Sequence, residues 1–184
     1  MNHPDLIRFC DRPAVQVAPD LLGAALLVGG VGGIIVEAEA YEPDDPASHS
    51  FGGPTARNAA MFGPPAHAYV YRSYGIHWCF NIVCRGASAV LVRALEPKWG
   101  IERMVERRGT SEISALAAGP GRLTQALAID KSHDARPLGA GGIELRPTVI
   151  RPVIVCGVRI GITKAADRPW RYGIAGSPFV SRRF

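Results

Sequence analysis

Short stretches of alternating apolar and polar residues, punctuated by glycines, mark the first quarter of the chain. Residues 21–41 predict two strands that meet at a cluster of four glycines. In the second strand, which contains VEAEAY, the small apolar residues fall on one face. Glu37, Glu39 and Tyr41 fall on the other, because successive side chains of a strand point to opposite faces. A solvent-exposed polar face explains this pattern as well as a buried site does.

The rest of the chain predicts more strands and two helices. Alternation on both sides of Tyr74-Gly75, over residues 66–84, is typical of a β-hairpin, although Tyr-Gly is not a preferred turn pair. Residues 42–66 lack periodicity, and a loop of this length usually carries function. Further strands are expected at 88–95, 143–162 and 170–176, and helices at 101–108 and 119–130, the second started by Pro120. The pattern predicts an α+β fold dominated by an antiparallel sheet.

The size and composition of the chain fit one folded domain spanning residues 1–184. Its 184 residues are 47% hydrophobic, enough for a single core. The net charge of +5 permits a polyanionic partner such as nucleic acid, but ordinary basic enzymes share it. The N-terminus lacks the apolar core of a signal peptide, and residues 21–30 are too short to span a membrane. We therefore expect a soluble, cytoplasmic protein with no membrane partner.

The cysteines and glycines predict neither a metal nor a nucleotide cofactor. The four cysteines form no CxxC pair, and no third ligand stands near His77 and Cys79. Reduced, buried thiols are the expected state. GVGGII at 30–35 lacks the helix that a dinucleotide-binding glycine loop requires.

The predicted hairpin separates a polar face from a core face. The polar set is Tyr69, Tyr71, Ser73, His77, Cys79 and Asn81, and the core set is Ile76, Trp78, Phe80 and Ile82. A tyrosine stripe is more often packing than a binding surface. Asn81 in an apolar strand either satisfies the backbone or contacts a ligand, since buried amides need partners.

Three further features suggest chemistry. Arg93, within VLVRALEP, must pair with a glutamate or reach an anion. Glu37 and Glu39 project in parallel from one strand, so we expect one to act as a general base and the other to be structural. Tyr74 lies at the predicted hairpin tip, where we do not expect a core residue. An exposed aromatic side chain of this kind can act as a wedge between base steps.

Several of these stretches together resemble the alkyladenine (3-methyladenine, N-methylpurine) DNA glycosylase family. The similar stretches are FCDRPAVQVAPDLLGAAL, VEAEAY with DDPASHS, TARNAAMF, AYVYRSYGIHWCFN, VLVRALEP, GPGRLTQALAI, RIGI and PWRYGIAGSPFVS. The resemblance implies a single domain around a curved, mainly antiparallel sheet flanked by helices, like the C-terminal domain of formyltransferases. It implies a monomeric, monofunctional enzyme of base excision repair without a cofactor. Its partner would be double-stranded DNA that contains alkylated or deaminated purines, which it flips out and hydrolyses to leave an abasic site.

The resemblance also implies roles for individual residues. Glu39 matches the general base, and Arg93 and the backbone carbonyl of Ile160 match the groups that hold the water. Glu37 receives no role and is expected to be structural. The residues expected to surround the flipped base are Tyr41, Tyr71 and His49, with Asn81 crowding the 2-amino group of guanine. Those expected to contact DNA outside the pocket are the wedge Tyr74, its neighbours Gly75 and Ile76, and Arg57.

Two other functions compete with this one. A non-catalytic module that binds distorted duplex DNA would share the basic charge and the wedge but would not need Glu39 with Arg93. A sugar hydrolase that uses Glu37 and Glu39 as its carboxylate pair would have no use for Tyr74. No lysine stands in the shared stretches, so a Schiff-base lyase step is not expected.

Overall fold

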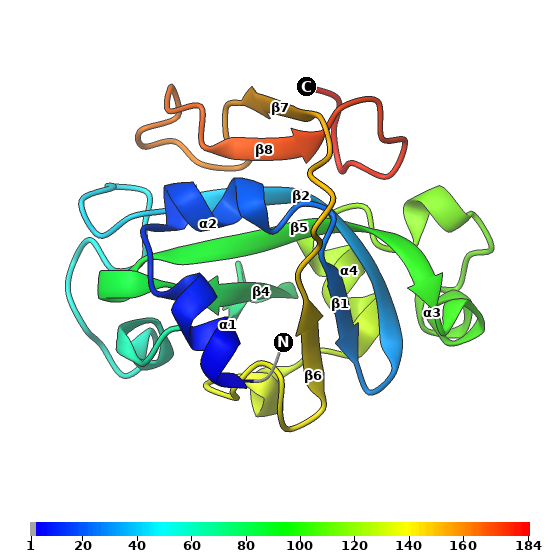
Figure 1. Ribbon diagram of the computed structural model, residues 1–184, viewed down its shortest axis with the longest axis horizontal. Coiled ribbons are helices and arrows are strands. Elements are labelled where there is room, and N and C mark those ends of the chain that lie inside the picture. Colours follow the sequence, from blue (N-terminus) through cyan, green and yellow to red (C-terminus); the bar gives the residue numbers. More distant parts are fainter. Residues whose placement is uncertain (1–2) are drawn as a thin grey trace.

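The computed structural model describes residues 3–184 and has an α+β fold, as predicted (Figure 1). All the strand pairs within these residues are antiparallel, in one curled sheet of order β3-β4-β5-β2-β1-β6, with β8 paired to β2 and β7 to β8. The strands are β1 (Ala25–Val28), β2 (Val31–Tyr41), β3 (Ala68–Ser73), β4 (His77–Val83), β5 (Ala89–Trp99), β6 (Ile143–Arg146), β7 (Ile154–Gly157) and β8 (Arg171–Ile174). The helices are α1 (His3–Cys10), α2 (Ala14–Asp20), α3 (Ile101–Arg108) and α4 (Pro120–Leu127).

Strand β2 organises the sheet because it has partners along both edges. β5 pairs with it along nearly its whole length, while β1 and β8 share the opposite edge. The register with β5 shifts on both sides of Glu37, leaving Val36 as an extra residue on β2 and Arg93 as an extra residue on β5. Such bulges bend a strand and re-aim side chains, and these two lie where both predicted carboxylates stand.

The two hairpins form as the alternation predicts. β1 and β2 are joined by Gly29 and Gly30, which both have positive φ, 57° and 78°, a conformation that costs glycine little. β3 and β4 pair from Ala68↔Ile82 to Ser73↔His77, so residues 74–76 form the tip. The loop between β2 and β3 consists of turns and one short 3₁₀ helix, Ala59–Phe62.

The helices cover one face of the sheet and complete the core (Figure 1). α4 packs against β4 and β5 and begins with Pro120 in its first turn, as predicted. The core gathers the apolar face of the β3–β4 hairpin, including Val70, Phe80 and Ile82. The opposite face of that hairpin is therefore free for a site.

Helices α1 and α2 were not predicted from the sequence, and strand β5 is longer than predicted. α1 and α2 have 8 and 7 residues and α2 contains Pro19, so neither is stable without tertiary contacts. Burial of Leu6, Cys10 and Val17 in the core supplies those contacts. β5 continues to Trp99, beyond the predicted end at residue 95, because β2 pairs with it that far.

Three of the four cysteines are buried. Cys10, Cys79 and Cys84 are buried and free, but Cys156 is exposed, so the expectation of buried thiols is wrong there. Cys156 lies on β7, an edge strand whose one partner among residues 3–184 is β8.

None of the helices in the described part of the chain is long and apolar enough to cross a membrane.

Candidate active site

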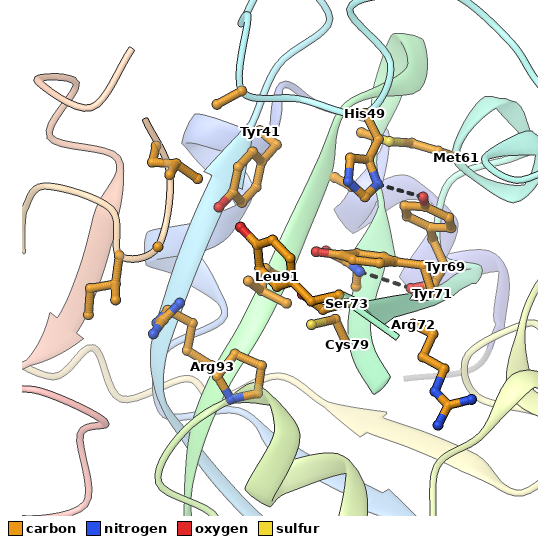
Figure 2. Close-up of a pocket in the computed structure, with 18 of the residues that line it drawn as sticks. Tyr41, His49, Met61, Tyr69, Tyr71, Arg72, Ser73, Cys79, Leu91 and Arg93 are labelled. Atoms are coloured by element: carbon orange, nitrogen blue, oxygen red, sulfur yellow. Dashed lines mark hydrogen bonds between the residues drawn. The ribbon is translucent and has the colours of Figure 1, made fainter. Parts of the chain in front are cut away.

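A pocket of about 730 Å³ opens beside the polar face of the β3–β4 hairpin (Figure 2). Its walls come from the end of β2, the loop of residues 42–67, strands β3 to β5 and the segment after β7. The predicted site residues that line it are Tyr41, His49, Arg57, Tyr71, Tyr74, Asn81, Arg93 and Ile160. Residues up to 123 positions apart in the sequence, from Tyr41 to Lys164, thus reach one cavity.

Aromatic rings form much of the pocket wall (Figure 2). The His49 ring lies edge-on to Tyr71, with 4.4 Å between ring centroids. Nδ1 of His49 is 2.8 Å from the Tyr69 hydroxyl, which fixes the imidazole. Asn81 donates from Nδ2 to the Tyr69 carbonyl at 3.0 Å. Asn81 therefore satisfies the backbone, as one of the two alternatives had it, and it also lines the pocket; a contact with a ligand stays a prediction.

The loop that carries His49 is held by a buried amide that the sequence did not single out. Asn58 donates from Nδ2 to the carbonyls of His49 and Gly53, at 2.8 and 3.1 Å. Its Oδ1 accepts from the backbone N–H and the hydroxyl of Thr55.

Loss of solvent around the His49 ring, and secondarily the charge of Arg57, lowers the pKa of His49. His49 is thus held in place and favours the neutral form.

Tyr41 is held on one side by a carboxylate and contacts a buried cation. Its hydroxyl donates to Oε2 of Glu39 at 2.8 Å. The Arg159 guanidinium lies 4.7 Å from the centroid of the Tyr41 ring and 5.3 Å from that of Trp170. Arg159 also forms an ion pair with Asp45 in which both side chains are buried. Burial, followed by the charge of Glu39, raises the pKa of Tyr41 well above its ordinary value, so its hydroxyl remains a donor.

Glu39 is completely buried, so the interpretation of VEAEAY as a solvent-exposed face is wrong. Its Oε1 accepts from the Ile160 N–H at 2.8 Å and lies 3.2 Å from Nη1 of Arg93. With the Tyr41 hydroxyl bonded to Oε2, two hydrogen bonds and one ion pair hold this carboxylate. The backbone of Ile160 therefore contacts Glu39 through its N–H, whereas the resemblance had pointed to its carbonyl as a contact of the water.

Glu37 is also completely buried, but it faces different partners. Its Oε1 accepts from Nε of Arg171 at 2.8 Å, from Nε of Arg93 at 3.1 Å and from the Ser181 hydroxyl at 2.9 Å. Its Oε2 accepts from the Ser181 N–H. This environment agrees with a structural role for Glu37. Arg93 makes the predicted salt bridge, and it does so with both glutamates at once.

The tip of the β3–β4 hairpin protrudes from the molecule. Tyr74 is 85% exposed and has φ of 49°, and Gly75 follows with φ of 69°. Two left-handed residues and the bond from the Ile76 N–H to the Ser73 carbonyl make a tight hairpin turn. Ile76 is 77% exposed, so its assignment to the core is wrong, because the turn lifts it off the sheet before β4 begins.

The pocket is surrounded by cations, including some that sequence reasoning missed. Arg57, Arg72, Arg93 and Lys164 line it, and none of its lining residues within the described chain is Asp or Glu. Arg57 was an expected DNA contact and donates from Nη2 to the Arg72 carbonyl at 3.2 Å. Lys164 lies in no predicted element, and its place beside RIGI was the one available signal.

This arrangement combines three chemical capacities. The aromatic walls suit a flat, unsaturated group. Glu39 does not itself line the pocket, but it contacts lining residues such as Tyr41 and Arg93, and a carboxylate can accept a proton. The cations suit phosphates around the mouth. Across residues 3–184, no cluster of three or more His, Cys, Asp or Glu side chains is arranged to hold a metal ion.

Comparisons with known proteins point to one family. The family described as methylpurine-DNA glycosylase matches residues 8–178. A protein of Rhizobium meliloti named "Putative 3-methyladenine DNA glycosylase" is 60% identical over 97% of this chain and 96% of its own length. Proteins with the same name from Rhodopseudomonas palustris and Nitrosospira multiformis are 58% and 56% identical, over 96% and 93% of this chain and 90% of their own lengths.

Proposed function

The chain belongs to the methylpurine-DNA glycosylase family, and from this premise we propose how it acts on DNA. It is a DNA glycosylase, a hydrolase of N-glycosyl bonds. In our proposal it flips a damaged purine nucleotide out of the duplex into the pocket, cleaves the glycosidic bond with a water that Glu39 activates, and leaves an abasic site. The observation that carries the proposal is the buried Glu39, held by Arg93 and Ile160 beside an aromatic pocket.

The shape of the pocket supports binding of a flipped purine. A purine is planar and stacks on aromatic faces, and Tyr41, His49 and Tyr71 supply such surfaces in one cavity. Asn81 is fixed to the Tyr69 carbonyl, so it is a rigid obstacle against an extra substituent such as the 2-amino group of guanine. Tyr74 at the exposed hairpin tip would fill the gap that the nucleotide leaves in the stack.

The reaction is a hydrolysis, and water is the only co-substrate that it needs. The water oxygen bonds to C1′ of the sugar, and the bond between C1′ and the purine nitrogen breaks with its electron pair going to the base. A cationic N-alkylated purine then leaves as a neutral base, whereas a neutral lesion takes up a proton as it leaves. Glu39 takes the proton of the water and stabilises the positive charge that develops on the sugar. A carboxylate has about four acceptor sites; on Glu39, Oε1 meets Ile160 and Arg93 and Oε2 meets Tyr41, so the remaining site is on Oε2 and becomes available to the water when the Tyr41 ring moves.

Burial of Glu39 has a consequence for the order of events. The carboxylate has no surface open to bulk solvent, and the Tyr41 hydroxyl covers Oε2. In our proposal the reacting water therefore reaches Glu39 only when the Tyr41 ring adjusts to the incoming base. Because the water is excluded until the lesion is bound, it cannot react while the protein is on an undamaged duplex.

The charges around the pocket support DNA as the partner. Arg57, Arg72 and Lys164 on the pocket wall can neutralise phosphates on either side of the flipped nucleotide. The sugar-hydrolase alternative finds less support, because Glu37 is committed to two arginines and to Ser181. A pure DNA-binding module would not need the buried contact between Arg93 and Glu39.

The decisive experiment measures excision directly. Duplexes that carry one 3-methyladenine, 7-methylguanine, hypoxanthine or ethenoadenine are incubated with the protein, and abasic sites are then cleaved with alkali. We expect strand cleavage on at least one of these duplexes and none on an undamaged duplex. Glu39→Gln is the matched control, because it keeps the shape of the side chain and removes the base. Binding of every lesion without cleavage by the unmodified protein would favour the binding module.

A further inference from the structure

We propose that Ser181 and Glu37 are positioning residues that hold Arg93 in the orientation the reaction needs, an inference that rests on the proposed function. Neither residue lines the pocket. Both act through the guanidinium of Arg93, which contacts Glu39 and belongs to a residue that lines the cavity. The segment that carries Ser181 would thereby be part of the active site, although it lies 88 residues beyond Arg93 in the sequence.

The first step is that the Arg93 guanidinium is held at all three nitrogens. Nε donates to Glu37 at 3.1 Å, Nη1 lies 3.2 Å from Glu39, and Nη2 donates to the Ser181 hydroxyl at 3.3 Å. A planar guanidinium fixed on three groups cannot rotate about its Nε–Cζ bond without breaking contacts. Removing one group leaves the charge in place but frees its orientation.

The second step is that the Ser181 hydroxyl connects the cation to the second carboxylate. A hydroxyl carries one hydrogen and can accept as well. Oγ of Ser181 donates that hydrogen to Oε1 of Glu37 at 2.9 Å and accepts from Nη2 of Arg93. The Ser181 N–H adds a further bond to Oε2 of Glu37. Serine or threonine at this position can make both hydroxyl contacts, and alanine can make neither.

The third step is that the charged groups around Arg93 are buried and pair with one another. Glu37 and Glu39 contribute two negative charges, and Arg93 and Arg171 contribute two positive charges. Arg171 is anchored by the carbonyl of Arg182 and by the Phe184 ring, whose centroid lies 3.8 Å from its guanidinium. Glu37 thus has a rigid cation on one side and Arg93 on the other. A carboxylate so placed orients Arg93 without touching the substrate.

The experiment compares Ser181→Ala with Ser181→Thr and with the control Ser177→Ala. Ser177 lies in the same segment, and its hydroxyl accepts a bond from the nearby Phe179 N–H. Single-turnover excision and duplex affinity are measured for each with the lesion that the unmodified protein cleaves fastest. We expect Ser181→Ala to slow excision by about tenfold with affinity unchanged, since a misplacement of about 1 Å can cost up to about 100-fold. Ser181→Thr should restore most of the rate, and Ser177→Ala should match the unmodified protein.

A second measurement separates failure of this inference from failure of the proposed function. In ¹⁵N NMR spectra a held guanidinium gives separate signals for its two Nη groups, because rotation about Nε–Cζ is slow, whereas a free one gives an average. We expect separate signals for Arg93 in the unmodified protein and in Ser177→Ala, and averaged signals in Ser181→Ala. An unchanged excision rate in Ser181→Ala would overturn the inference. Should the unmodified protein cleave no lesion, the proposed function fails, and the NMR signals alone decide whether Ser181 positions Arg93.

Discussion

Arg93 bridges two buried carboxylates, with Nη1 lying 3.2 Å from Oε1 of Glu39 and Nε 3.1 Å from Oε1 of Glu37. Arg93 is the extra residue of β5 where the register with β2 shifts, so a local irregularity of the sheet lies at this contact. The two carboxylates differ in their other partners. Glu39 meets the pocket residues Tyr41 and Ile160, and Glu37 meets Arg171 and Ser181.

Exchange of each glutamate for glutamine should separate the two roles. Glu39→Gln removes the proposed base, so excision should fall by about 100-fold or more, which is the usual scale for loss of a general base. Lesion binding should persist. Excision by Glu37→Gln should fall by only about tenfold, because Glu37 acts through the orientation of Arg93. Single-turnover rates at equal folded yield provide the comparison. A larger loss in Glu37→Gln than in Glu39→Gln would mean that the base is wrongly assigned.

Tyr74→Ala should impair flipping without harming the fold. Extruding a nucleotide costs about a few kcal/mol in lost stacking and pairing, and an aromatic wedge offsets part of this cost. Because the side chain is 85% exposed, the melting temperature should hardly change. Excision should fall more for a well-paired lesion than for the same lesion opposite a mismatch. Equal losses in the two duplexes would argue against the wedge.

The ion pair between Asp45 and Arg159 should be important for stability. Both side chains are buried, and removing one partner of such a pair costs about 3–5 kcal/mol. Asp45→Ala should therefore lower the free energy of unfolding by that amount in urea titrations. Asp44→Ala changes an exposed neighbour and should stay within about 0.5 kcal/mol of the unmodified protein. Similar stabilities for the two variants would contradict this prediction.

His49 should titrate below the ordinary histidine pKa of about 6.5. Desolvation is the main cause and the charge of Arg57 the second, so Arg57→Ala should raise the pKa of His49 toward its ordinary value. Because the folded pKa lies below the unfolded one, the stability that neutral His49 contributes is present above about pH 6.5 and is lost as pH falls through the folded pKa. NMR titration of the imidazole in both proteins measures this. A pKa that falls in Arg57→Ala would contradict the assigned cause.

Lys164 should contribute one phosphate contact. Duplex affinity should fall steeply with salt, and each neutralised phosphate adds about 0.9 to the slope of log affinity against log salt concentration. Lys164→Ala should reduce the magnitude of the slope by about that amount. Lys131→Ala is the control, since Lys131 pairs with Asp134 and does not line the pocket. A slope that both variants share with the unmodified protein would remove Lys164 from the DNA contacts.

The sequence by itself determined the elements whose local signals are strong. The glycines between β1 and β2 and the alternation around Tyr74 fixed two hairpins, and Pro120 marked the start of α4. Short elements without a strong local signal, such as α1 and α2, were missed because their stability comes from burying residues such as Leu6 in the core.

Tertiary structure decided how the candidate site is assembled. Alternation placed Glu37 and Glu39 on one face of a strand but could not tell a buried face from an exposed one, because burial depends on what packs against it. Arg159 and Ser181 reach Tyr41 and Arg93 from the last part of the chain, at separations over which no periodicity carries information. The amino-acid pattern therefore identified which groups could act, whereas the packing of distant segments decided which carboxylate contacts the pocket residues Tyr41 and Ile160 and which one pairs with Arg171.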